Sequence, residues 1–297
     1  MTSTTTDGTS NGREFLRRVQ ASSLSPKRRR IAEYLATNYR TAVAQTAAEL
    51  ATTMGTSEAT VIRLARELGY DGFPGLRRHL HEMVRADFTS LDLLERERTS
   101  RGTNDDTLAE VAHAEIEHLR AMMANVPREE FRRLVDVLLR AKRVYVAGHR
   151  ASAALAQFLG YELAKVHPDV VTLFGDGSAA YDAFRVVPPG TWLVGIAYPR
   201  YPRETLELLD FAREEGISIA AITDSVVSPA ARRADLTLAV AAAPVSFVDS
   251  HGAPQALISA VLVEYGLRAR RRTEAMLRRF ERISERRRIF HTERRSE

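Results

Sequence analysis

The sequence predicts an α/β protein: a small all-helical N-terminal domain, then a doubly wound, five-stranded parallel sheet with helices on both faces. Three observations predict this class. Up to about residue 126, apolar residues recur every three or four positions, which is the period of an amphipathic helix. Beyond it, nearly continuous apolar runs alternate with helical segments, as in a parallel sheet buried on both faces. The length of 297 residues suffices for two such domains.

The pattern divides the chain into five segments. Residues 1–12 are rich in Ser and Thr, and we expect them to be a disordered tail. Residues 13–88 form the helical domain, and residues 89–126 form a charged linker followed by a connecting helix. Residues 127–268 form the α/β domain, and residues 269–297 form a basic amphipathic helix that we expect to pack against the rest of the protein.

The helical domain contains two short amphipathic helices separated by the turn Met54-Gly55-Thr56. Gly55 can adopt the left-handed conformation that ends a helix, and Ser57 can cap the helix that follows. Longer helices are expected before and after this pair, over residues 27–38, with Ser25 and Pro26 as the start signal, and over residues 74–88.

A helix, a short turn with Gly and a second helix make the helix-turn-helix pattern, whose second helix enters the DNA major groove. In the second helix the apolar stripe consists of Val61, Ile62, Ala65 and Leu68. The residues left facing outward are Glu58, Ala59, Thr60, Arg63, Arg66 and Glu67. An ordinary helical hairpin has the same spacing, so the spacing alone leaves both interpretations open.

Charge is distributed unevenly along the chain. Residues 1–85 carry 13 Lys and Arg against 8 Asp and Glu, a net charge of +5. Residues 86–265 carry 18 against 25, a net charge of −7, and residues 266–297 carry 12 against 5, a net charge of +7. A basic segment around a helix-turn-helix is the expected footprint of phosphate binding. Solvated helix faces would give the same charge runs.

Composition excludes several classes of protein. There is no cysteine, which excludes a disulfide framework and a thiolate metal site or nucleophile. The N-terminus lacks the apolar core of a secretory signal, and no run of about eighteen apolar residues occurs. We therefore expect a cytoplasmic protein without a membrane partner.

The α/β domain is expected to contain five strands, at residues 143–147, 170–174, 192–197, 218–223 and 236–240. Helices are expected at residues 151–165, 179–185, 202–215, 228–233 and 255–270. Ligands of such folds bind at the carboxyl ends of the strands. Three loops at these ends, starting at Gly148, Tyr198 and Asp224, each lead to a helix N-terminus, where free N–H groups favour an anion. Alternatively, Ser152 and Ser228 only cap helices.

The segments SEATVIRLARELGYDGFPGLR (residues 57–77) and ITDSVVSPAARRADLTL (residues 222–238) resemble the RpiR family of bacterial transcription regulators. The resemblance extends over about residues 13–268 and includes the sugar isomerase (SIS) domain, a phosphosugar-binding fold. It implies a homodimer or larger homo-oligomer that binds a DNA operator. It also implies a small anionic effector, a phosphosugar in this family, that changes operator binding.

The resemblance also implies the site residues. Base edges would be read by Glu58, Thr60 and Arg63, and phosphates would be held by Ser57, Arg66 and the run Lys27-Arg28-Arg29-Arg30. The effector would contact Ser152, Arg200, Arg203, Thr205, Thr223, Ser225 and Ser228. The third loop, residues 198–205, departs from the family because it has lost the usual serines and keeps only Thr205. Either its arginines replace the hydroxyl contacts with charge-assisted ones, or the loop has lost phosphosugar binding.

Catalysis is the main alternative. A phosphosugar isomerase of this fold needs a general base, for which His149, His251 and Glu264 are candidates. Residues 13–88 would have no role in such an enzyme, so we expect a regulator that is not an enzyme and has no cofactor. A metal site is not expected, because His113 and Glu117 lie one turn apart on a polar helix face. A nonspecific DNA-coating protein is a third class, but the acidic α/β domain would add nothing to it.

Overall fold

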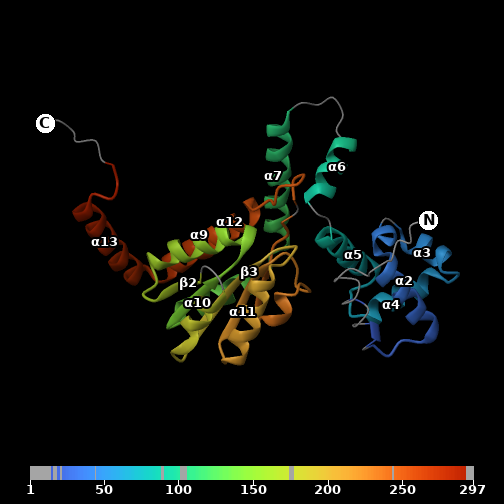
Figure 1. Ribbon diagram of the computed structural model, residues 1–297, viewed down its shortest axis with the longest axis horizontal. Helices are drawn as coiled ribbons and strands as arrows, with labels where there is room; N and C mark the ends of the chain where they lie inside the picture. Colours follow the sequence, from blue (N-terminus) through green and yellow to red (C-terminus); the bar gives the residue numbers. More distant parts are fainter. Residues whose placement is uncertain are drawn as a thin grey trace. The chain divides into compact units, whose positions relative to one another are not determined.

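The structure is a computed structural model that describes residues 15, 19–20, 22–43, 45–87, 90–100, 106–173, 177–242 and 244–291. The chain divides into two compact units, Met1–Thr99 and Ser100–Glu297 (Figure 1). The expected tail of residues 1–12 lies outside the described residues. Among those described, no helix is both long and apolar enough to cross a membrane.

Unit 1 is helical, as expected. Its helices are α2 (Pro26–Ala42), α3 (Ala47–Thr53), α4 (Glu58–Glu67), α5 (Phe73–Asp87) and the start of α6 (Ser90–Ser100). They enclose one apolar core, whose fully buried side chains include Leu35, Leu50, Leu64, Leu76 and Leu80. Leu64 extends the stripe expected for α4, whereas Ile62 at its margin is only partly buried.

Local signals fix the α3–α4 pair. Thr46 and Glu49 form a reciprocal capping box at the start of α3, which satisfies two backbone N–H groups. These hydrogen bonds from Thr46 lower the pKa of the Glu49 carboxyl. Gly55 has a φ of +60°, so the left-handed conformation expected from the sequence ends α3. Ser57 then accepts a hydrogen bond from the Thr60 N–H and caps α4.

The expectation of a linker over residues 89–105 was partly wrong, because α6 occupies Ser90–Ser100. Charge was taken as the sign of a linker, but Leu, Glu and Arg are all strong helix formers, and Asp92 lies in the first turn. Residues 101–105 lie outside the described residues. The expected connecting helix is α7 (Thr107–Asn125).

Unit 2 contains the five-stranded parallel sheet that the sequence predicts. Its strands are β1 (Arg143–Ala147), β2 (Val170–Leu173), β3 (Thr191–Ala197), β4 (Ser218–Thr223) and β5 (Leu236–Ala239), in the order β2-β1-β3-β4-β5. All four neighbouring pairs are parallel. The order changes direction at β1, which makes the sheet doubly wound.

Two apolar layers cover the sheet (Figure 1). Val144 and Val146 of β1 pack on α8 (Arg128–Arg140), α9 (Ala153–Ala164) and α12 (Gly252–Arg268). The alternate residues Tyr145 and Ala147 point to the other face, which α10 (Gly177–Asp182) and α11 (Arg203–Glu214) cover. This period-2 alternation with apolar residues on both sides is why the strands read as continuous apolar runs.

Two details differ from the expectation. Residues 228–233 do not form an α-helix, and only a 3₁₀ turn, η3 (Ala231–Arg233), is present, because Ala234 directly after it is already extended and leads to β5. Helix α8 was not predicted, although its apolar residues follow helical spacing. The C-terminal segment forms α13 (Arg270–Arg287), which continues from α12 after a break at Ala269. It contacts the rest of the unit through Arg272, which donates to the Leu139 carbonyl at 3.4 Å.

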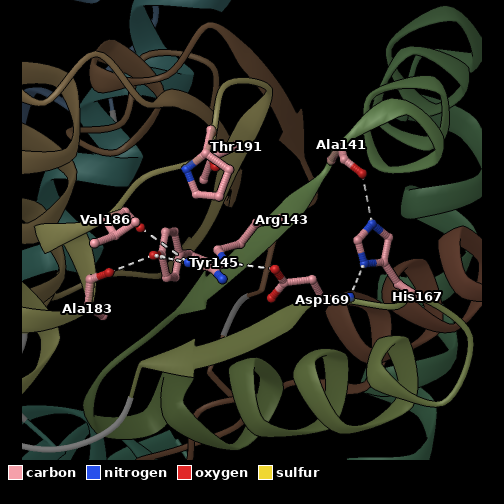
Figure 2. Close-up of polar contacts among 9 residues, drawn as sticks. Ala141, Arg143, Tyr145, His167, Asp169, Ala183, Val186 and Thr191 are labelled. Carbon is pink, nitrogen blue, oxygen red and sulfur yellow. Dashed lines mark hydrogen bonds and ion pairs between the residues drawn. The ribbon is translucent and has the colours of Figure 1, made fainter.

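A polar network joins the amino ends of β1 and β2 (Figure 2). The Arg143 Nε donates to Asp169 Oδ2 at 2.9 Å, and the buried Tyr145 hydroxyl donates to the Ala183 carbonyl at 2.6 Å. The His167 Nε2 lies 3.1 Å from the Ala141 carbonyl, and its Nδ1 accepts from the Asp169 N–H. These partners require the neutral tautomer with the proton on Nε2. Burial lowers the pKa of His167.

Candidate nucleic-acid interface and anion-binding pocket

Helix α4 buries one face and exposes the other. Val61, Leu64 and Ala65 are inaccessible to solvent, whereas the six residues expected to face outward are exposed, except Thr60, which is partly buried. The side chains of Arg63 and Arg66 make no hydrogen bond or ion pair with any residue that the structure describes. Two cations on the exposed face of the second helix therefore keep their full hydrogen-bonding capacity for a partner.

The N-terminus of α4 adds hydrogen-bonding groups. The Ser57 and Thr60 hydroxyls lie 2.9 Å apart, and the Thr60 N–H donates to Ser57 Oγ at 3.4 Å. Exposed Ser57 and the first free N–H groups of the helix can hold a phosphate. Glu58 is exposed beside them, and as an ionised carboxylate it can only accept hydrogen bonds.

In the basic run at the start of α2, two side chains are exposed and two contact other residues of the same unit. Lys27 and Arg30 are exposed. The Arg28 Nε lies 2.6 Å from Glu67 Oε2, and only 23% of the Arg28 side chain is exposed. Arg29 reaches the Ser22 carbonyl at 3.5 Å. Arg28, which the sequence suggested as a phosphate contact, thus joins α2 to the last residue of α4.

A pocket of about 580 Å³ lies at the carboxyl edge of the sheet in unit 2. Three segments line it: the turn after β1, the β3–α11 loop, and the end of the loop before α12. Its charged residues are Arg150, Arg200, Arg203, Glu204 and Asp249. Arg150 has a φ of +57°, a left-handed conformation that is unfavourable for a side-chain-bearing residue. Three guanidinium groups against two carboxylates suit a ligand with an anionic group and hydroxyl donors.

Two polar atoms of the pocket lining are buried without a hydrogen-bond partner among the described residues, the Tyr198 hydroxyl and His251 Nε2. Burial, with a smaller contribution from Asp224, raises the pKa of Tyr198 well above its ordinary value. Burial lowers the pKa of His251, although Asp249 and Glu115 oppose this. The two rings lie 6.1 Å apart and together form this wall of the pocket.

The third loop has its own internal bonds. The Tyr201 hydroxyl donates to Asp224 Oδ1 at 2.9 Å and so ties the loop to the end of β4. The exposed Arg203 Nε lies 2.6 Å from Glu207 Oε1 one helical turn later. Arg200 lies at the rim and is exposed.

Three of the seven effector residues expected from the sequence line the pocket: Ser152, Arg200 and Arg203. The other four do not. Thr205 is fully buried, accepts from the His149 N–H, and lies 2.9 Å from His149 Nδ1. Ser225 Oγ accepts from the Val227 N–H. These hydroxyls hold the loops in shape.

The hydrogen bonds of Thr223 and Ser228 show what the Ser228 hydroxyl does in the fourth loop. Thr223 is fully buried and donates to Ser228 Oγ at 3.0 Å, and Ser228 Oγ accepts from the Ala231 N–H at 3.0 Å. Ser228 therefore bonds within its own segment at the start of η3, whose own N-cap residue is Ala230. Ser152 makes no side-chain cap bond and lies in the pocket wall.

Sequence reasoning missed Arg150, Tyr198, Glu204 and Asp249 as pocket residues. Arg150 and Tyr198 carried a usable signal, since Tyr198 directly follows a predicted strand and Arg150 lies three residues beyond another. Asp249 lies nine residues or more beyond the last strand, where the sequence gave no signal. Of the candidate bases, His251 lines the pocket, His149 is engaged with Thr205, and Glu264 is not part of the lining. No group of three or more potential metal ligands occurs within the part of the chain that the structure describes.

Comparisons with known proteins agree with both units. Residues 13–86 match the helix-turn-helix domain of the rpiR family, and residues 137–264 match the SIS domain. An uncharacterized HTH-type transcriptional regulator of Caldanaerobacter subterraneus is 24% identical over 233 residues, which cover 77% of this chain and 80% of that protein.

Two solved structures share the fold. The sugar isomerase domain of an RpiR transcription factor from Sphaerobacter thermophilus is 31% identical, with a TM-score of 0.58, and the match covers 60% of this chain and 99% of that one. The Vibrio vulnificus NanR protein, solved as a complex with ManNAc-6P, is 21% identical with a TM-score of 0.58, covering 91% of this chain and 97% of that one. This chain belongs to the RpiR family of helix-turn-helix transcriptional regulators, with an N-terminal helix-turn-helix domain and a C-terminal SIS domain.

Proposed function

We propose that the protein is a DNA-binding transcriptional regulator whose affinity for its operator changes when a small anionic effector occupies the pocket of unit 2. One observation carries the proposal: a single chain combines two elements. One is a helix-turn-helix whose Arg63 and Arg66 side chains have no partner among the described residues, and the other is an arginine-lined pocket at a sheet edge where ligands bind.

On the DNA side, α4 enters the major groove. Arg63, Glu58 and Thr60 contact base edges, and Arg63 pairs with guanine. Ser57, Arg66 and Lys27 contact phosphates and produce the salt dependence of binding. Arg28 is a weaker candidate for a phosphate contact, because its guanidinium group already pairs with Glu67. A phosphate would have to share that cation with the Glu67 carboxylate.

On the effector side, the composition of the pocket supports a phosphosugar. Arg150, Arg200 and Arg203 replace the hydroxyl contacts that the third loop lacks, and guanidinium groups bind phosphate strongly. Glu204 and Asp249 can accept hydrogen bonds from sugar hydroxyls. NanR, of the same fold, was solved with ManNAc-6P. These observations make ManNAc-6P and related sugar phosphates the first compounds to test.

The regulator acts as a homodimer or larger homo-oligomer in the cytoplasm. Two copies would place two α4 helices about one DNA turn, roughly 34–36 Å, apart, and the operator would be an inverted repeat. An effector in unit 2 would change the geometry between the two helices and so the preferred spacing of half-sites.

The experiment is to sequence the genomic fragments that the purified protein retains at physiological salt. A few sites that share an inverted repeat are expected. Equal retention of all fragments would contradict the proposal and would favour a nonspecific DNA-coating protein. Turnover of a sugar phosphate in a separate assay would favour an isomerase, for which His251 in the pocket wall would be the base.

A further inference from the structure

A polar cluster joins the pocket wall to helix α7. Asp249 and His251 line the pocket, and Ser250 between them is buried with its side chain directed at α7. The Ser250 hydroxyl donates to Glu115 Oε1 at 2.6 Å, and the His118 Nδ1 lies 3.1 Å from Ser250 Oγ. Because the single hydroxyl proton goes to Glu115, His118 must be the donor to Ser250.

The Glu115 carboxylate also lies at the N-terminus of α12. A Cβ added to Gly252, the first residue of α12, would lie 2.2 Å from Glu115 Oε2, so the carboxylate lies close to the backbone at this helix end. His251, the residue before the helix, provides no side-chain cap. A carboxylate from α7 therefore supplies the negative charge that favours this helix end. The same Oε2 lies 3.9 Å from His118 Nδ1.

Helix α7 is the segment of unit 2 that directly follows the helical unit in the chain. None of the residues of α7 is fully buried, and the helix packs on α12 (Figure 1). Leu108, Ile116 and Met123 leave large apolar surfaces exposed. Partly buried Leu119 and Met122 pack α7 against the apolar core of unit 2. The hydrogen bonds of Ser250 to Glu115 and His118 add a polar contact to this packing.

We propose that Glu115, His118 and Ser250 transmit the state of the pocket wall to α7, and along the chain to the DNA-binding helices. A ligand that contacts Asp249 or His251 displaces the peptide that carries Ser250. The Ser250–Glu115 bond then converts that displacement into a shift of α7. These are positioning residues, which do not touch the ligand. The inference rests on the proposed effector pocket, but the bond itself can be tested without an effector.

The first test measures amide hydrogen exchange in the ligand-free full chain. In Ser250→Ala, the amides of α7 should exchange about five to ten times faster, as expected for the loss of one hydrogen bond that holds the helix. Ser259→Ala is the matched control, because Ser259 lies in α12 and its hydroxyl bonds only the Gln255 carbonyl one turn earlier. Equal exchange of α7 in both variants would overturn the proposal.

A double-mutant cycle then tests transmission, still without ligand. His251→Ala alters the pocket wall and should change the exchange rate of α7. In the Ser250→Ala background the same substitution should have no further effect on α7. Additive effects would mean that the pocket wall reaches α7 by another route, and the proposal would be wrong.

The last test measures operator affinity with and without saturating ManNAc-6P. If ManNAc-6P changes the operator affinity of the wild-type protein by about fivefold or more, Glu115→Gln and Ser250→Ala should still bind both operator and ManNAc-6P. In these variants, however, ManNAc-6P should no longer change the affinity for operator. Glu117→Gln, an exposed neighbour paired with Arg120, should still show that change. A retained response in Ser250→Ala would contradict transmission. Failure of wild type to bind ManNAc-6P would count against the proposed effector, while the exchange experiments would still decide the inference.

Discussion

The two edges of one sheet differ in how they use their polar side chains. At the amino edge, Arg143, Tyr145 and His167 all bond to carbonyl or carboxylate oxygens of the same chain (Figure 2). At the carboxyl edge, Tyr198 and His251 leave buried polar atoms without a partner among the described residues, and three arginines surround a cavity. Buried polar groups are normally satisfied, so unpartnered atoms that also line an arginine-rich cavity are candidates for contact with a ligand. The Tyr265 hydroxyl beside His167 is also without a partner among the described residues, but it does not line the pocket.

The comparison predicts the largest effect for Arg200→Ala at the carboxyl edge. The loss of a charge-assisted hydrogen bond should weaken binding of the effector by about tenfold or more and abolish the operator response, with little change in Tm. Isothermal titration calorimetry measures the first quantity. Arg140→Ala, an exposed arginine of α8 outside the pocket, is the control. An unchanged response would remove Arg200 from the site.

At the amino edge, Tyr145→Phe should have the opposite effects: it should lower stability and leave effector affinity unchanged. The change leaves the Ala183 carbonyl without its 2.6 Å partner in a buried position, which should cost about 1–2 kcal/mol of unfolding free energy. Urea unfolding measures the loss, and effector affinity should not change. Tyr161→Phe, in which the exposed hydroxyl of α9 is removed, should be neutral. A loss of effector affinity in Tyr145→Phe would break the distinction between the edges.

Lowering the pH should gradually reduce the unfolding free energy through protonation of His167 at the amino edge. Its folded-state pKa is lowered from 6.5 by burial, so the unfolded chain binds the proton more readily. The stability that His167 contributes is present above pH 6.5 and is lost as the pH falls through the lower folded-state pKa. His149 and His251 are lowered in the same direction. Urea midpoints between pH 7.5 and 5 should fall less steeply in His167→Gln, and an unchanged slope would contradict the assignment.

The smallest effect is expected for Arg203→Ala at the rim of the pocket. Its side chain is 87% exposed and its ion pair with Glu207 is a solvent-screened i,i+4 pair on the surface, which contributes little to stability. Tm should stay the same, and effector affinity should fall less than in Arg200→Ala. A loss as large as that of Arg200→Ala would show that Arg203 leaves Glu207 to hold the ligand.

Patterns of apolar residues made the fold predictable from the sequence. The predicted strand boundaries lie within one residue of the observed ones, because buried parallel strands are unbroken apolar runs. The exception is the predicted end of the second strand, residue 174, which lies outside the described residues. Gly55 and Ser57 were identifiable because each has a distinct physical role, in the turn and in the cap. Helix α6 was missed because a charged helix and a charged linker have similar compositions.

The pocket was harder to predict for a physical reason. A serine or threonine at a strand end can face the ligand or bond within its own loop, and the sequence does not distinguish the two. Thr223 and Ser228 bond to each other and Thr205 bonds His149 of the first loop, whereas Ser152 lines the cavity. Asp249 enters the site from a loop that follows the last strand, and only the three-dimensional structure brings it there.

The most direct test of the account measures operator and random-sequence DNA binding by wild type and Arg63→Ala, using fluorescence anisotropy at fixed salt. We predict that Arg63→Ala loses about 1–3 kcal/mol of discrimination, roughly 5- to 150-fold, while its affinity for random DNA changes far less. Arg30→Ala, an exposed cation of α2, should weaken both equally. An unchanged ratio between operator and random DNA in Arg63→Ala would contradict sequence reading by the exposed face of α4.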